Sequence, residues 1–246
     1  MNVAIILAGG EGKRMNHPIP KQYLKLNRKP IIFYILKTYS EIKEVNKILV
    51  VSHKERFGFL KKLCKTNHFP LKKIYFLEKD KTRQLSSFKA LKFCKEEFKC
   101  KDKDVVIFQD GVRPFVKKEI IKKCIREARK CGAAVAIVPS TETFASVDEK
   151  GNLKKTFPPG SLHFGKSPEV FQWKIIFTAH CKALRNKIED YRNNFGLVLY
   201  NKYPVKTVEG DYSDIKITTP FDIKIALKIL KDNAQNANKR TQSKKT

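Results

Sequence analysis

Short apolar runs alternate with longer amphipathic segments along the first half of the chain. The apolar runs are five or six residues long, rich in β-branched side chains and bounded by turn or charged residues, which is typical of buried strands. We expect such strands at residues 3–7, 47–51, 73–77, 104–108 and 133–138. The segments between them have helical spacing, and we expect helices at residues 30–41, 54–66, 84–98 and 117–131. The alternation predicts an α/β, Rossmann-like fold, whose mostly parallel sheet is covered by helices on both faces.

The pattern changes between Ser140 and about Gln172. This stretch has short alternating pieces, a turn at Lys150-Gly151 and a proline pair, so we expect a β-arm at about 140–172 inserted in the sheet domain. Arms of this kind often join two copies of a chain, and we expect a homodimer through this one. A helix at 173–184, a strand within 203–210 and a last helix at 220–230 complete the pattern.

Beyond Leu230 the sequence is polar and basic and shows no apolar periodicity. We therefore expect a single domain over residues 1–231, followed by a disordered basic tail over residues 232–246. The stretch SDIKITTP, which begins at Ser213 and contains Lys216, alternates as a strand would.

The composition is that of a globular protein, with 41% hydrophobic and 31% charged residues among 246. No apolar run approaches the roughly 20 residues that a membrane span needs, and the first residues do not resemble a secretory signal. The six cysteines form neither a Cys-x-x-Cys pair nor a zinc-like cluster, which indicates free thiols in a reducing compartment. We expect a cytoplasmic protein without a membrane partner.

The formal net charge of +28 raises the question of nucleic-acid binding. The lysines, however, are spread along almost every helix-like segment, and no arginine-rich arm or aromatic stacking platform organises them. A nucleic-acid partner is therefore not favoured. The positive electrostatic field of the protein would concentrate small anions such as nucleotides and sugar phosphates.

A glycine-rich turn follows the first expected strand. Gly9, Gly10 and Gly12 allow close approach of the backbone to a ligand, and Arg14 and Lys21 could hold a polyanion. The turn matches neither the Walker loop nor the dinucleotide-binding pattern. By itself it is more commonly a strand-to-helix turn with solvated charges.

Other polar residues follow the later strands. Because ligands of open parallel sheets bind outside the carboxyl ends of the strands, we expect these residues to share one edge. They are Asp80, Arg83, Ser86, Asp110, Arg113, Asp211, Asp214 and Lys216, in addition to Ala8 and the glycine turn after the first strand.

Such a set of carboxylates, cations and backbone N–H groups suits a metal–triphosphate ligand, with Asp110 placed as an oxygen ligand for Mg²⁺. The alternatives are that Asp110 caps a turn, that Arg113 is structural and that Lys216 is an exposed edge lysine. The five histidines form no relay, and covalent acyl chemistry is not expected.

These motifs resemble a known family. The blocks LAGGEGKRM…PKQYL, TRQLSSFKAL, QDGVRPF, KSPEVFQ and VEGDYSDIKITTPFDI are similar, in order and spacing, to the cytidylyltransferases that act on methylerythritol phosphate and on pentitol phosphates such as ribitol 5-phosphate. The resemblance covers Asn2 to Leu230. The first block alone indicates only a nucleotidyltransferase fold, whereas D-x-x-R-P-F together with the late D-I-K-I-T is more specific.

The resemblance implies a reaction of CTP with a polyol phosphate, with Mg²⁺, that gives a CDP-polyol and pyrophosphate. It implies catalytic roles for Arg14 and Lys21 at the triphosphate and for Lys216 at the attacking phosphate. The implied nucleotide-binding residues are Leu7, Ala8, Gly9, Gly10, Gly12, Lys79, Asp80, Arg83, Ser86 and Asp110, of which Asp110 also binds the metal. The implied acceptor-binding residues are Arg113, Thr143, Lys166 and Lys216.

The chain departs from the family pattern mainly on the acceptor side. The departures are Lys79-Asp80 for Gly-Gly, Gly111-Val112 after Asp110, Glu142-Thr143 for Asp-Thr, Ser167-Pro168-Glu169 for Thr-Pro-Gln, Phe157-Pro158-Pro159-Gly160 where the arm arginine is expected, and the loss of a Thr-Asp block near Asn186 to Asp190. Together with Ala8-Gly9-Gly10, they favour a pentitol phosphate or a related capsule or wall precursor as the acceptor. Methylerythritol phosphate is the alternative acceptor. A basic nucleic-acid-binding protein and a catalytically silent homologue are the alternative functions.

Overall fold

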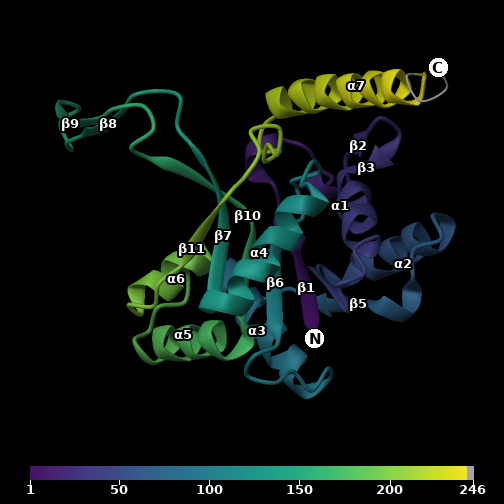
Figure 1. Ribbon diagram of the computed structural model, residues 1–246, viewed down its shortest axis with the longest axis horizontal. Coiled ribbons are helices and arrows are strands. Elements are labelled where there is room, and N and C mark those ends of the chain that lie inside the picture. The colour runs from purple at the N-terminus through teal and green to yellow at the C-terminus, as the bar shows by residue number, and fades with distance from the viewer. Residues whose placement is uncertain (243–246) are drawn as a thin grey trace.

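The structure, a computed structural model, describes residues 1–242 and is built around a seven-stranded sheet (Figure 1). The strand order is β11-β7-β10-β6-β1-β4-β5. The strands are β1 (Asn2–Leu7), β4 (Lys47–Ser52), β5 (Ile74–Glu78), β6 (Val105–Asp110), β7 (Ala133–Pro139), β10 (His163–Gln172) and β11 (Lys206–Glu209). Neighbouring strands are parallel except for β10, which runs antiparallel to both β6 and β7. β1 therefore lies between two parallel partners, and its last residue is level with Val51 of β4 and Asp110 of β6.

Helices cover both faces of the sheet, because alternate residues of each buried strand point to opposite sides. Ala4 and Ile6 of β1 pack with α1 (Ile31–Ser40), α2 (Phe57–Thr66) and α4 (Lys118–Cys131). Val3 and Ile5 of the same strand pack with α3 (Arg83–Glu96), α5 (Trp173–Arg185) and α6 (Asn194–Tyr200). The expected α/β fold with helices on both faces is confirmed, and α6 is a helix that the sequence pattern did not predict.

A third, smaller core lies beside the carboxyl end of β1. There α7 (Pro220–Gln242) packs Ala226 against Met15, Leu26 and Ile31. The short elements η1 (Lys13–Met15), η2 (Lys21–Tyr23), β2 (Lys25–Leu26) and β3 (Lys29–Pro30) carry the chain from the glycine turn to α1. This packing holds the cations that follow the turn close to the sheet edge.

The structure corrects the expected arm. β8 (Phe144–Val147) and β9 (Leu153–Phe157) form a hairpin that extends away from the sheet (Figure 1), but the second half of the expected arm does not belong to it. Residues 163–172 form β10, whose Val170 and Phe171 are fully buried between β6 and β7. A central strand was thus mistaken for part of the arm, because its amino-terminal half is polar.

Two further expectations differ from the structure. Residues 215–219, including Lys216, form no strand, and Ile217 instead donates its backbone N–H to the carbonyl of Val112. The last helix does not end at Leu230 but continues to Gln242, so residues 232–242 are helical in the structure, where the sequence pattern predicts a disordered tail. This part lacks apolar positions but is rich in helix-forming residues such as Ala, Gln and Lys. Residues 243–246 of the expected tail lie outside the described residues, and the division into domain and tail stays a prediction.

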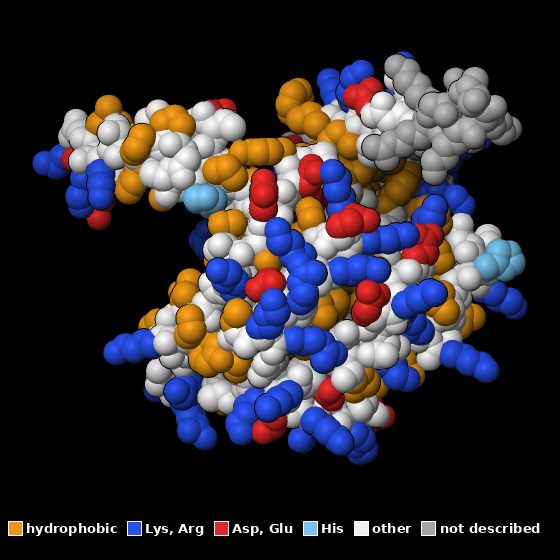
Figure 2. Space-filling view, viewed as in Figure 1, with side chains coloured by type: hydrophobic (Ala, Val, Ile, Leu, Met, Phe, Trp, Pro, Cys, Tyr) orange, Lys and Arg blue, Asp and Glu red, His pale blue; other side chains and the backbone are white. Residues whose placement is uncertain are grey.

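The distribution of surface charge and the state of the cysteines agree with what the composition predicts. Lys and Arg side chains are spread over the visible face rather than gathered in one patch (Figure 2). Within residues 1–242, no helix is both long and apolar enough to cross a membrane. The six cysteines, all within the described part, are free thiols, and Cys64, Cys94, Cys100 and Cys124 are buried.

Candidate active site

A cleft of about 560 Å³ opens at the carboxyl ends of β1, β5 and β6. Every residue that we assigned to nucleotide, metal or catalysis lines this cleft. They are Leu7, Ala8, Gly9, Gly10, Gly12, Arg14, Lys21, Lys79, Asp80, Arg83, Ser86, Asp110 and Lys216. The topology rule that ligands bind at the carboxyl ends of parallel strands therefore gathers residues more than 200 positions apart in the chain.

The glycine turn forms one wall of the cleft, and hydrogen bonds from Gln22 hold its backbone in place. The Gln22 side-chain amide is buried and donates to the carbonyl of Ala8 at 2.7 Å and to that of Gly10 at 3.0 Å. Gly9 is required here, because a Cβ at this position would lie 2.7 Å from the Cβ of Lys79. Gly12 has a φ of +76°, which disfavours other residues. Sequence reasoning missed Gln22, although it directly follows Lys21.

Lys21 and Arg14 both line the cleft, as does Lys216. Lys21 is buried, with 9% of its surface exposed, whereas Arg14 is exposed. Burial and the positive charges of Lys216 and Arg14 lower the pKa of Lys21 to about 8. Like charges held together in this way are stabilised by an anion, so the cleft is suited to a polyphosphate.

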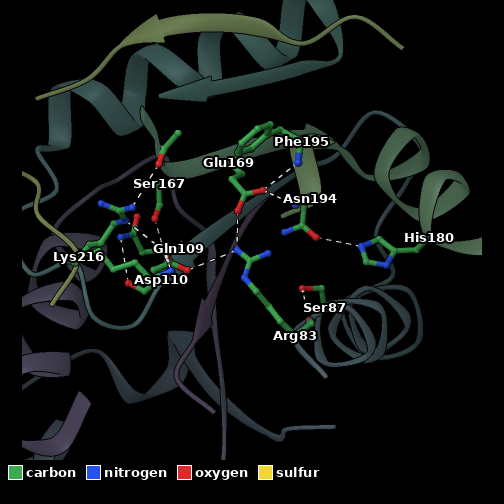
Figure 3. A network of polar contacts seen from close by, with 12 residues as sticks. Arg83, Ser87, Gln109, Asp110, Ser167, Glu169, His180, Asn194, Phe195 and Lys216 are labelled. Atoms are coloured by element: carbon green, nitrogen blue, oxygen red, sulfur yellow. Dashed lines mark hydrogen bonds and ion pairs between the residues drawn. The ribbon is translucent and has the colours of Figure 1, made fainter. Parts of the chain in front are cut away.

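Asp110 ends β6 at the centre of the cleft and contacts three cations (Figure 3). Its Oδ2 lies 2.9 Å from Nζ of Lys216 and 3.3 Å from Nε of Arg113, and its Oδ1 lies 3.6 Å from Nη2 of Arg83. Burial opposes the charge of Asp110, but these three cations outweigh it and hold the pKa of the carboxyl well below its usual range. Asp110 is therefore an anion at neutral pH.

The remaining acceptor-binding candidates do not line the cleft. Arg113 is buried and donates to the carbonyls of Asp214, at 2.9 Å, and Gly165, at 3.4 Å. Lys166 donates to the same Asp214 carbonyl at 3.1 Å, and Thr143 is exposed next to the hairpin. Of the four acceptor-binding candidates, only Lys216 lines the cleft. Arg113 and Lys166 are occupied by backbone carbonyls in this arrangement.

Two buried acids lie near the cleft: Asp214, which the sequence placed only at the expected sheet edge, and Glu169, to which it gave no role. Asp214 has an Oδ1 without a hydrogen-bond partner in the described residues, and burial raises its pKa to about 7. Glu169 lies on β10 and accepts a hydrogen bond of 2.6 Å from Nη2 of Arg83 (Figure 3). No local signal could have revealed the pairing of Arg83 with Glu169, because these two residues are 86 positions apart.

The donor set fits a hydrated magnesium ion rather than a metal held by protein alone. Within the described residues, no group of three or more His, Cys, Asp or Glu side chains could hold a metal. Mg²⁺ is commonly bound by one or two carboxylates together with substrate phosphates. Asp110 offers such a carboxylate, ionised and in the wall of the cleft.

Comparison with known proteins identifies the family. A family model described as IspD, 2-C-methyl-D-erythritol 4-phosphate cytidylyltransferase, matches residues 2–232. The chain belongs to this family. It is thus a CTP-dependent cytidylyltransferase, as the motifs predicted.

Relatives in this family carry two names. The chain is 33% identical to a 2-C-methyl-D-erythritol 4-phosphate cytidylyltransferase of Clostridium novyi, over 94% of this chain and 97% of the relative. It is 34% identical to a ribitol-5-phosphate cytidylyltransferase of Vibrio parahaemolyticus, over 96% of this chain and 98% of the relative.

Solved structures of IspD proteins have the same fold. A 4-diphosphocytidyl-2C-methyl-D-erythritol synthase of Anaerococcus prevotii is similar with a TM-score of 0.80 and 28% identity, covering 94% of this chain and 96% of that one. The cytidylyltransferase of Thermus thermophilus has a TM-score of 0.72 at 23% identity, covering 93% of this chain and 98% of that one, and supports the fold alone. The nucleotidyltransferase fold expected from the resemblance is therefore confirmed.

Proposed function

We propose that this enzyme transfers CMP from CTP to a phosphorylated polyol and releases pyrophosphate, and that the acceptor is a pentitol phosphate such as ribitol 5-phosphate. The observation that carries the proposal is the placement of Lys216 on Asp110, in the same cleft that Lys21 and Arg14 line. One cation is thus placed for an incoming phosphate and two for the triphosphate.

The reaction needs positioning more than proton transfer. An oxygen of the acceptor phosphate, already an anion, forms a bond to the α-phosphorus of CTP. The bond from that phosphorus to the bridging oxygen breaks, and pyrophosphate leaves with the electron pair. Lys21 and Arg14 stabilise the charge that develops on the phosphoryl oxygens, and Lys216 holds the attacking phosphate in line. No histidine lines the described cleft, which agrees with a reaction that needs no general base.

Magnesium is the proposed metal, held by Asp110 and the phosphates of CTP. When bound, it would neutralise charge on the triphosphate and help pyrophosphate to leave. The protein's own contribution there is the carboxylate, which neighbouring cations keep ionised at neutral pH.

The pentitol phosphate is favoured by three observations. The chain carries Ala8-Gly9-Gly10 in the glycine turn, as the pentitol-phosphate enzymes do in the resemblance. It lacks the family's arm arginine, and Phe157-Pro158-Pro159-Gly160 stands in its place. Arg113 contacts the backbone carbonyls of Asp214 and Gly165 and does not line the cleft. The relative from Vibrio parahaemolyticus is named for ribitol 5-phosphate, whereas the name of the Clostridium novyi relative supports 2-C-methyl-D-erythritol 4-phosphate as the second candidate.

Pyrophosphate release distinguishes these acceptors. Each of the four nucleoside triphosphates is offered with ribitol 5-phosphate, 2-C-methyl-D-erythritol 4-phosphate and a panel of other polyol and sugar phosphates. We expect the highest kcat/KM with CTP and a pentitol phosphate. A higher value with 2-C-methyl-D-erythritol 4-phosphate would transfer the assignment to isoprenoid synthesis, and no release with CTP and any acceptor would refute the proposal.

The assembly and setting follow as part of the same proposal. Phe144, Val147, Leu153 and Phe164 are exposed apolar residues on or beside the hairpin (Figure 2), and their burial in a second copy would give the expected homodimer. The six free thiols suit the cytoplasm, where the CDP-polyol would serve as a precursor for capsule or wall polymers. Sedimentation of the protein against a Leu153→Asp variant tests the dimer, which the variant should weaken.

A further inference from the structure

Glu169 is a buried carboxylate with both oxygens engaged, and only 4% of its surface is exposed. Its Oε1 accepts the 2.6 Å hydrogen bond from Nη2 of Arg83. Its Oε2 accepts from the backbone N–H groups of Asn194, at 2.7 Å, and Phe195, at 3.1 Å, where α6 begins (Figure 3). The side chain is therefore fixed between the cleft and α6.

Two carboxylates compete for Arg83. The same Nη2 atom that lies 2.6 Å from Oε1 of Glu169 lies 3.6 Å from Oδ1 of Asp110. The contact with Glu169 has the length of a strong charge-assisted hydrogen bond, whereas the contact with Asp110 is longer than a hydrogen bond. Glu169 thus takes the guanidinium as its close partner, and Asp110 is left with Lys216 and Arg113 on its other oxygen.

The surroundings make Glu169 the natural counter-charge for Arg83. Asn194 links the start of α6 to His180 through a contact of 3.2 Å between its Oδ1 and Nε2. Burial lowers the pKa of His180 to about 4, so this end of the network is neutral. The family pattern has glutamine where this chain has Glu169, and glutamine would keep the shape of the side chain without its charge.

We propose that Glu169 is a positioning residue, which draws Arg83 away from Asp110 and keeps Oδ1 of Asp110 open to magnesium-bound CTP. The inference rests on the proposed use of CTP and magnesium. It adds a residue outside the cleft that sets how strongly the metal assists nucleotide binding. Outer-shell partners of this kind commonly change metal affinity by 10–100-fold.

The test compares CTP binding in EDTA with binding in a titration of MgCl₂, both measured by calorimetry without an acceptor. In Glu169→Gln, Arg83 loses its charged partner and turns to Asp110. We expect the half-saturating magnesium concentration for the CTP complex to rise about tenfold. Binding in EDTA should not weaken, because the cleft gains one net positive charge.

Two further variants separate this role from a merely structural one. Arg83→Gln in the Glu169→Gln background removes the cation that turns to Asp110, so the magnesium dependence should return toward that of the wild type. Arg83→Gln alone should not raise the half-saturating magnesium concentration, even where CTP binds more weakly at every concentration. This single variant keeps the proposal testable if Glu169→Gln fails to fold.

Asn193→Ala is the matched control for damage to α6. Its side chain accepts from the N–H of Gly196 at 2.6 Å and caps this helix, but it does not contact Arg83. We expect a wild-type magnesium dependence. The proposal is overturned if this control shifts the dependence as much as Glu169→Gln, or if the double variant does not recover. Failure of the wild type to bind CTP at any magnesium concentration would instead refute the proposed function.

Discussion

Raising the pH from 7 to 9 should weaken CTP binding about tenfold, because Lys21 of the protein without CTP loses its proton over this range. Burial, Lys216 and Arg14 together lower its pKa to about 8. A bound triphosphate places negative charge beside the same ammonium group, which raises the pKa in the complex. Binding therefore takes up a proton. It is fully favoured below the pKa of the free protein and weakens as the pH rises above it.

The magnitude follows from the protonated fraction of the free protein. With a pKa of about 8, Lys21 is about nine-tenths protonated at pH 7 and about one-tenth protonated at pH 9. If the complex stays protonated throughout, the dissociation constant increases about tenfold between these values. The phosphates of CTP do not confuse the result, because their last ionisation lies near pH 6.

Calorimetric titration of CTP at several pH values, each in two buffers of different ionisation enthalpy, measures the affinity and the proton uptake together. Lys21→Arg is the matched variant, because its guanidinium stays charged at pH 9. We expect the wild type to take up close to half a proton at pH 8 and the variant to show a much flatter profile. Equal pH profiles in the two proteins, or no proton uptake by the wild type, would refute the assignment to Lys21.

Three other predictions concern single side chains. Arg14→Ala should lower kcat/KM by about 10²–10³, because it removes a cation aimed at the triphosphate. The control variant Arg126→Ala lies at the opposite end of the sheet and should change kcat/KM only a few-fold. Steady-state pyrophosphate release checks both variants. Gly111→Ala should cost about 1–3 kcal/mol in urea unfolding, because its Cβ would lie 2.8 Å from the carbonyl oxygen of Leu7; an unchanged midpoint would contradict this packing. Asp214→Asn should raise the free energy of unfolding at pH 8 by up to about 4 kcal/mol. The pKa of Asp214 is about 7 in the folded protein and 3.8 in the unfolded chain, so the wild type loses stability as the pH rises from 3.8 to 7. Parallel unfolding curves of the two proteins should differ least near pH 4, and a difference that does not depend on pH would contradict the assignment.

The residues that we expect to bind the nucleotide could be assigned to one cleft from the sequence, because several of them end or directly follow buried strands. Leu7 ends β1, Ala8 to Gly10 follow it, and Asp110 ends β6, so the fold itself brings them together. The period of the apolar runs is enough to place such strands, and their parallel order is enough to place their ends. Lys216 was placed correctly by its motif although its expected strand does not exist.

The acceptor side was not predictable in the same way, because its contacts join distant segments through backbone atoms. Arg113 and Lys166 meet on the carbonyl of Asp214, and no residue pattern marks a carbonyl as a partner. β10 was hidden because half of it is polar, although its buried half carries Glu169 into the network. The extra turns of α7 were missed because a helix without an apolar face has no periodicity to detect.

The network around Asp110 also connects the two substrates of the proposed reaction. Lys216 is held by Asp110 before a ligand enters, at 2.9 Å, whereas Lys21 faces the like charges of Lys216 and Arg14. A metal that takes up the charge of Asp110 must weaken the hold on Lys216, because both draw on the same carboxylate. Under the proposed function, binding of the nucleotide with its metal would thus also free Lys216 for the acceptor phosphate. Under the proposed function, Asp110 would therefore influence the binding of both substrates, and Glu169 would act on Asp110 through Arg83.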